Sequence, residues 1–190
     1  MKLERAASRF VKTPISTWDG TRWRLTETKI ALMPTSTAEE MQTLIKVKIG
    51  ETKLDTLTLF KVESTGQIYL VGQAAQDVQG TAYCKMYYTR RAKYQGDIVS
   101  FQKTMAASGM AMGVTRQVES TVFCDMDYAS SVASPHFHKQ QLSTVLLYLP
   151  RDAAITTANE MHIGSKFYDI KEVYLQDGIK VCSALEKNSA

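Results

Sequence analysis

The sequence has few of the residues that build metal sites or disulfide frameworks. Only three cysteines and three histidines occur among its 190 residues, and the cysteines are widely spaced. An odd, scattered set of thiols indicates a reducing compartment and excludes a disulfide scaffold. Cys84 and Cys182 occupy equivalent places in two similar segments, which favours packed side chains over thiol chemistry.

Motifs that mark common catalytic sites are also absent from the sequence. It contains no Gly-x-x-x-x-Gly-Lys phosphate loop, no Gly-x-Ser-x-Gly elbow, no Cys-x-x-Cys and no His-Glu-x-x-His. His136 and His138 have a spacing that metal sites use, but a third ligand would have to come from Cys124, Asp125, Asp127 or His162. Asp125 and Asp127 are better read as residues of a strand than as a catalytic pair. We therefore expect no enzyme activity, no metal and no cofactor.

Long apolar runs are missing as well. No stretch is long enough to span a bilayer, and residues 1–9 lack the apolar region of a signal peptide, so we expect no membrane association. Apolar residues make up 44% and charged residues 22%, a balance typical of globular chains. The net charge of +4 is only mildly basic, which suits work near a polyanion without indicating nucleic-acid binding by itself.

One hairpin pattern occurs twice. In Gly164–Cys182, apolar residues alternate on both sides of Asp177-Gly178, a dipeptide that tolerates the positive φ angles of a tight hairpin turn. The earlier copy is Gly66–Cys84, and its two glycines and its cysteine each lie 98 residues before their counterparts (Gly66 and Gly164, Gly80 and Gly178, Cys84 and Cys182). An apolar strand precedes each copy. The recurrence favours a duplicated module over two unrelated hairpins.

We therefore predict a mainly β fold of two related small β-barrel or sandwich modules. The first module covers residues 1–100 and includes a basic N-terminal arm, and the second covers residues 101–190. Ser36 or Thr37 followed by Glu39 or Glu40 has the pattern of a helix cap, so one short helix is expected near 37–46.

Two stretches are candidate contact surfaces. Residues 87–94 mix basic and aromatic side chains, a pattern that binds single-stranded nucleic acid by stacking and phosphate contact but also occurs in a solvated strand end. Residues 105–113 combine glycine, alanine and methionine and read either as a subunit-docking loop or as a crossover between the modules. The candidate residues of this docking loop are Met105, Gly109, Met110, Met112 and Gly113.

The second module resembles the head–tail joining proteins of tailed bacteriophages, also called head-closure, neck or connector proteins. The resemblance is carried by Val145-Leu-Leu-Tyr-Leu-Pro-Arg-Asp and by Met161-His-Ile-Gly-Ser-Lys-Phe-Tyr-Asp-Ile-Lys-Glu-Val173, which is similar to the family pattern I-x-x-G-x-x-Y-x-V/I. In the first module, Trp18-Asp-Gly-Thr-Arg-Trp23 is similar to the family's D-G-x-W turn. Ile30-Ala-Leu-Met-Pro34 is similar to its Q-P segment, with Met33 in place of glutamine. Family members usually contain one module, whereas this chain is expected to contain two.

The resemblance implies a virion structural protein that forms a homo-oligomeric ring below the portal, closes the DNA-filled head and docks the tail. Its implied partners are further copies of itself, the portal or adaptor protein, tail proteins and packaged DNA bound without sequence specificity. The implied location is the virion neck, with the host cytoplasm during assembly. Arg90, Arg91 and Lys93 are the candidate residues facing the DNA channel.

Several alternatives stay open. Six copies with two modules each could fill twelve positions, or one module could bind a different partner. A tail-completion or tail-terminator protein is a close alternative function. A small β-barrel nucleic-acid-binding protein is a more distant one, and a hydrolase or metal enzyme is the third class.

Overall fold

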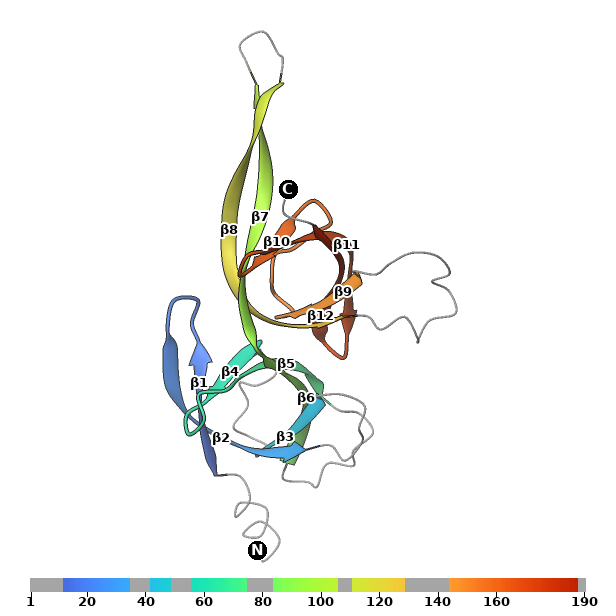
Figure 1. The fold of residues 1–190 in the computed structure, drawn as a ribbon. Helices are drawn as coiled ribbons and strands as arrows, with labels where there is room; N and C mark the ends of the chain where they lie inside the picture. Colours follow the sequence, from blue (N-terminus) through green and yellow to red (C-terminus); the bar gives the residue numbers. More distant parts are fainter. Residues whose placement is uncertain are drawn as a thin grey trace, which may run out of the picture. The chain divides into compact units, whose positions relative to one another are not determined.

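The computed structural model of the chain is built from β-strands (Figure 1). It describes residues 12–34, 42–48, 56–74, 84–105, 111–128 and 144–187, and no helix occurs among them. The chain divides into two compact units. The first holds the described residues up to Ala92 together with Pro150–Asp152 and Leu175–Ile179, and the second holds the remaining described residues from Lys93 onward. The prediction of a mainly β fold is confirmed.

The first unit contains a closed barrel of six antiparallel strands in the order β1-β2-β3-β6-β5-β4. Closure comes from β1 and β4, where Ile15 pairs with Val62. A closed barrel leaves no open sheet edge along the paired residues, so its backbone donors and acceptors are satisfied internally. Its strands are β1 (Thr13–Trp18), β2 (Trp23–Pro34), β3 (Gln42–Lys48), β4 (Leu59–Val62), β5 (Ile68–Ala74) and β6 (Cys84–Ala92).

The second unit contains another closed six-stranded barrel, in the order β7-β8-β9-β12-β11-β10. Here β10 closes the barrel against β7 through Glu160 and Val99. Its strands are β7 (Tyr94–Met105), β8 (Ala111–Tyr128), β9 (Thr144–Leu149), β10 (Glu160–Ile163), β11 (Lys166–Gln176) and β12 (Ile179–Lys187).

Both barrels have the same strand order: two three-stranded meanders joined through their third and sixth strands. The first pair of repeated glycines, Gly66 and Gly164, falls at matching places in it, and Gly80 lies outside the described residues. Gly66 connects β4 to β5 with a φ of 69°, and Gly164 connects β10 to β11 with a φ of 61°. Both turns need a left-handed residue, which glycine adopts without steric cost. The sequence repeat therefore corresponds to a repeat of topology.

The Asp177-Gly178 turn forms as the sequence predicts. It joins β11 to β12, and its two residues have φ angles of 49° and 76°. Positive φ at both central positions is the requirement of a type I′ hairpin, and Asp-Gly satisfies that requirement at low cost.

Each barrel has its own apolar core. In β9, Val145, Leu147 and Leu149 are completely buried, while the residues between them are only partly buried. The second core also contains Tyr168 and Ile170 from β11. The first core gathers Ile15, Ile30, Phe60, Val62, Tyr69, Val71 and Tyr87.

The prediction of a short helix near 37–46 is wrong for the residues of this range that the structure describes. Residues 42–46 belong to strand β3, which pairs with β2 on one edge and with β6 on the other. Its sequence alternates the β-branched residues Thr43, Ile45 and Val47, which favour extended backbone. Pairing along two edges outweighs the helix-cap pattern upstream, and residues 37–41 lie outside the described part of the chain.

The described residues within 105–113 do not form a crossover between the modules. Met105 ends β7, while Met112 and Gly113 belong to β8, so all three lie within one hairpin of the second unit. Gly109 and Met110 lie outside the described residues. The passage from one unit to the other occurs instead at Lys93, between β6 and β7.

Candidate functional site: a hairpin arm and its base

The longest hairpin of the structure extends beyond its own barrel. We call residues 100–105 of β7 and 111–118 of β8 the hairpin arm; it is visible in Figure 1 as the long ribbon of the second unit. Residues 113–121 are all exposed, whereas β9 of the same barrel alternates between buried and half-buried positions. Val114 is 60% and Val118 is 56% exposed. The arm therefore presents apolar side chains to its surroundings instead of packing them in a core.

The outer edges of the arm are open along its described residues. Strand β7 pairs with β10 only over Asp97–His162, Ile98–Met161 and Val99–Glu160. Strand β8 pairs with β9 only from Asp125 to Tyr128. A two-stranded ribbon is marginally stable alone, and unpaired strand edges can accept another strand by β-augmentation. Chemically, the arm is suited to protein contact.

A β-bulge lies at the base of the arm. Ile98 pairs with Ser120 and Val99 pairs with Val118, so Glu119 is an extra residue on β8. Bulges bend a strand and redirect a side chain. Here the Glu119 carboxylate lies next to Asn159, whose Nδ2 donates to Oε2 at 3.4 Å.

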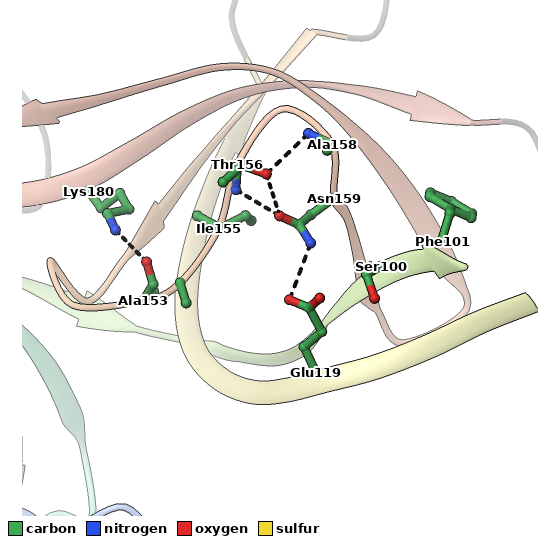
Figure 2. Close-up of a pocket in the computed structure, with 10 residues that line it drawn as sticks. Ser100, Phe101, Glu119, Ala153, Ile155, Thr156, Ala158, Asn159 and Lys180 are labelled. Carbon is green, nitrogen blue, oxygen red and sulfur yellow. Dashed lines mark hydrogen bonds between the residues drawn. The ribbon is translucent and has the colours of Figure 1, made fainter. Parts of the chain in front are cut away.

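A cavity of about 470 Å³ opens beside this bulge (Figure 2). Phe101, Glu119 and Lys180 line it together with the connection from Ala153 to Asn159. Asn159 organises this connection, because its Oδ1 accepts from both the backbone N–H and the hydroxyl of Thr156 at 2.8 Å. Lys180 Nζ donates to the carbonyl of Ala153. The polar groups around the cavity thus bind mainly one another, and they do not assemble a nucleophile with a general base.

Glu160 is the charged centre of the arm's base. It is 1% exposed, and its Oε1 accepts from Lys187 Nζ. Its Oε2 lies 3.3 Å from His162 Nε2 and 3.8 Å from Arg116 Nε. Burial acts to raise the pKa of Glu160, but the Lys187 hydrogen bond, with His162 and Arg116, lowers it below its ordinary value. The buried carboxylate therefore stays ionised at neutral pH.

The structure separates the three basic residues predicted to face DNA. Arg90 is 4% exposed and lies within β6. Arg91 is exposed on the same strand. Lys93 Nζ lies 3.1 Å from Oδ1 of the buried Asp125. Arg91 and Lys93 are both exposed, but Lys93 is held in an ion pair with Asp125 and Arg90 is buried.

Sequence reasoning missed the residues at the base of the arm. Phe101, Arg116 and Glu160 come from three strands and meet only through the barrel's pairing. A signal was present in Thr115–Thr121, where Val118 is the single apolar residue and the alternation of a barrel strand is missing.

Two cysteine thiols are buried in the second unit, and this predicts low reactivity. Burial raises the pKa of Cys124 and of Cys182 to about 12 from an ordinary value of 9.0. The thiolate fraction at neutral pH is then roughly 1,000-fold lower than for a free thiol. We expect iodoacetamide at pH 8 to leave both cysteines unmodified in the folded chain and to alkylate both in urea, as read by peptide mass spectrometry. Rapid native alkylation of either thiol would contradict the buried geometry.

Within the described ranges, no group of three or more His, Cys, Asp or Glu side chains could hold a metal ion. His136 and His138 lie outside these ranges. The described part of the chain also contains no helix long and apolar enough to cross a membrane.

Comparisons of the chain with protein-family models, with curated proteins and with solved structures found no match.

Proposed function

We propose that this chain is a structural virion protein of the head–tail connector of a tailed bacteriophage. In this role it forms a ring below the portal, closes the filled head and docks the tail. The observation that carries the proposal is the contrast between closed barrels and an open arm. Barrels without free edges serve as rigid bodies, while the hairpin arm offers the unpaired backbone and apolar side chains that join subunits.

The residues that resemble the connector family support the same proposal. They lie in two stretches: β9 with the start of the connection after it, and β10 with most of β11. The pattern glycine is the left-handed turn residue Gly164, and the tyrosine, one position later than in the pattern, is the buried Tyr168. The shared positions are therefore those that shape this barrel.

Ring assembly requires two different surfaces on each subunit. A closed ring is built from heterologous contacts, in which one patch of a subunit binds another patch of its neighbour. An arm from one copy could pair along a neighbour's strand or lie across its surface. This mechanism is assembly, and it uses no catalytic residue, metal or cofactor.

Immuno-electron microscopy of purified phage particles tests the proposal directly. We expect an antibody against this chain to label the junction between head and tail. Label elsewhere on the particle would keep a structural role but reject the neck, with a tail-tip or tail-tube position in its place. Absence from particles, with abundant protein in the lysate, would reject the structural role. A salt-dependent gel shift would then test the nucleic-acid-binding alternative.

Arg91 is the basic residue through which contact with channel DNA can be tested. Arg91→Glu replaces an exposed positive charge with a negative one, so we expect particles carrying it to retain less packaged DNA, as measured by nuclease-protected genome per particle. Arg22→Glu, another exposed arginine of the first unit, is the matched control for charge. Unchanged DNA retention with Arg91→Glu would remove DNA contact from the role of this residue.

A further inference from the structure

One cross-strand pair ties both strands of the hairpin arm to the second barrel. Phe101 of β7 and Arg116 of β8 lie directly opposite each other. The Arg116 guanidinium lies 5.4 Å from the centre of the Phe167 ring. The Phe101 ring centre lies 5.9 Å from Lys187 Nζ. Each strand of the arm therefore has its own contact with the barrel, at the same level of the ribbon.

Glu160 links these two contacts. Its carboxylate accepts from Lys187 through Oε1 and lies 3.8 Å from Arg116 Nε through Oε2. His162 shares Oε2 and also packs edge-on against Phe167, with ring centres 4.4 Å apart. We call this set, centred on Glu160, the Glu160 latch (Phe101, Arg116, Glu160, His162, Phe167 and Lys187).

Next to the latch lies a point where the ribbon can bend. The bulge at Glu119 interrupts the register between β7 and β8, and the cavity beside it is lined by Phe101 and Glu119 (Figure 2). The hydrogen bond of 2.5 Å between Gln102 and Gln117 crosses the level of the Phe101–Arg116 pair and joins the two arm strands to each other. Further out, strand pairing continues from Gln102 opposite Thr115 to Thr104 opposite Gly113. The arm is thus internally joined beyond the latch and bent below it.

We propose that the hairpin arm is a hinged lever, with the Glu119 bulge as its pivot and the Glu160 latch holding one orientation. Opening the latch frees the arm without opening the barrel, because the β7–β10 and β8–β9 pairings lie at or inside the bulge. This inference goes beyond the proposed function. It concerns a motion of the isolated chain and can fail independently of any role in a virion.

Hydrogen–deuterium exchange of the purified full chain tests the lever. Glu160→Gln keeps the size of the side chain and removes the charge that holds Lys187 and Arg116. We expect peptides covering 100–105 and 113–118 to exchange about tenfold faster, the effect of losing charge-assisted hydrogen bonds at one site. Peptides of β9 and β12 should keep their wild-type protection.

Two further variants make the result decisive. Glu186→Gln is the matched control, because it removes a lysine pair of the same unit, with Lys166 at 2.8 Å, that does not touch the arm. Arg116→Gln removes the contact between the arm and Glu160 while leaving Glu160 with Lys187 and His162. This variant tests the lever if Glu160→Gln does not fold. Unchanged arm exchange in folded Arg116→Gln would overturn the lever. Equally faster exchange in the arm, β9 and β12 would also overturn the lever, because the variant would then have lost stability throughout the barrel.

Discussion

Replacement of Tyr168 by alanine is expected to lower the free energy of unfolding by about 3–5 kcal/mol. The side chain is completely buried in the second barrel, and its hydroxyl lies 3.7 Å from Met126 Sδ as a donor. Truncation removes the aromatic ring and leaves a cavity that neighbouring strands cannot fill without moving. Burial also raises the pKa of Tyr168, which is consistent with a hydroxyl withdrawn from water.

Urea denaturation followed by far-ultraviolet circular dichroism measures this loss. Tyr174→Ala is the matched control, because the same change on the same strand removes a ring that is 42% exposed. Its cost should stay within about 1 kcal/mol. Equal costs for the two variants would show that the inward position of Tyr168 does not carry the stability of this barrel.

The second large effect is expected at Lys93, where Lys93→Met should cost about 3–5 kcal/mol. Asp125 is 0% exposed, and Lys93 Nζ lies 3.1 Å and 3.5 Å from its two carboxylate oxygens. Methionine keeps most of the side-chain length but withdraws the positive charge from a buried negative one. The cost arises from the carboxylate left in a low-dielectric surrounding, and not from lost packing.

Three further variants separate this charge effect from other causes, again by urea denaturation. Lys171→Met breaks an exposed pair with Asp169 and should cost at most about 1 kcal/mol. Lys93→Arg keeps the charge and should retain most of the stability. The double variant Lys93→Met with Asp125→Asn should lose less than Lys93→Met alone. A double variant no more stable than Lys93→Met alone would contradict a direct pair.

The basic residues between 90 and 93 show what could not be predicted from the sequence. Arg90, Arg91 and Lys93 form one charged stretch in the sequence, but the barrel turns them to different surroundings. Arg90 is buried, Arg91 is exposed and Lys93 binds Asp125. Neighbours on a strand point to opposite faces, so a run of charges cannot be read as one surface before the faces are known.

The sequence by itself determined the local features. The Asp177-Gly178 turn, the left-handed Gly66 and Gly164, and the alternating residues of β9 depend on local backbone preferences and a two-residue period. The same local signals indicated the repeat, since Gly66 and Gly164 form left-handed turns at the same place in the two barrels.

Only the tertiary structure decided the rest. Pairing along both edges of β3 outweighed the helix-cap pattern that precedes this strand. The described residues of the methionine-rich segment 105–113 belong to the β7–β8 hairpin. The hairpin arm and the Glu160 latch depend on contacts among β7, β8, β10, β11 and β12. Such contacts are set by barrel closure and register, which bring distant residues together and leave no periodic signal along the chain.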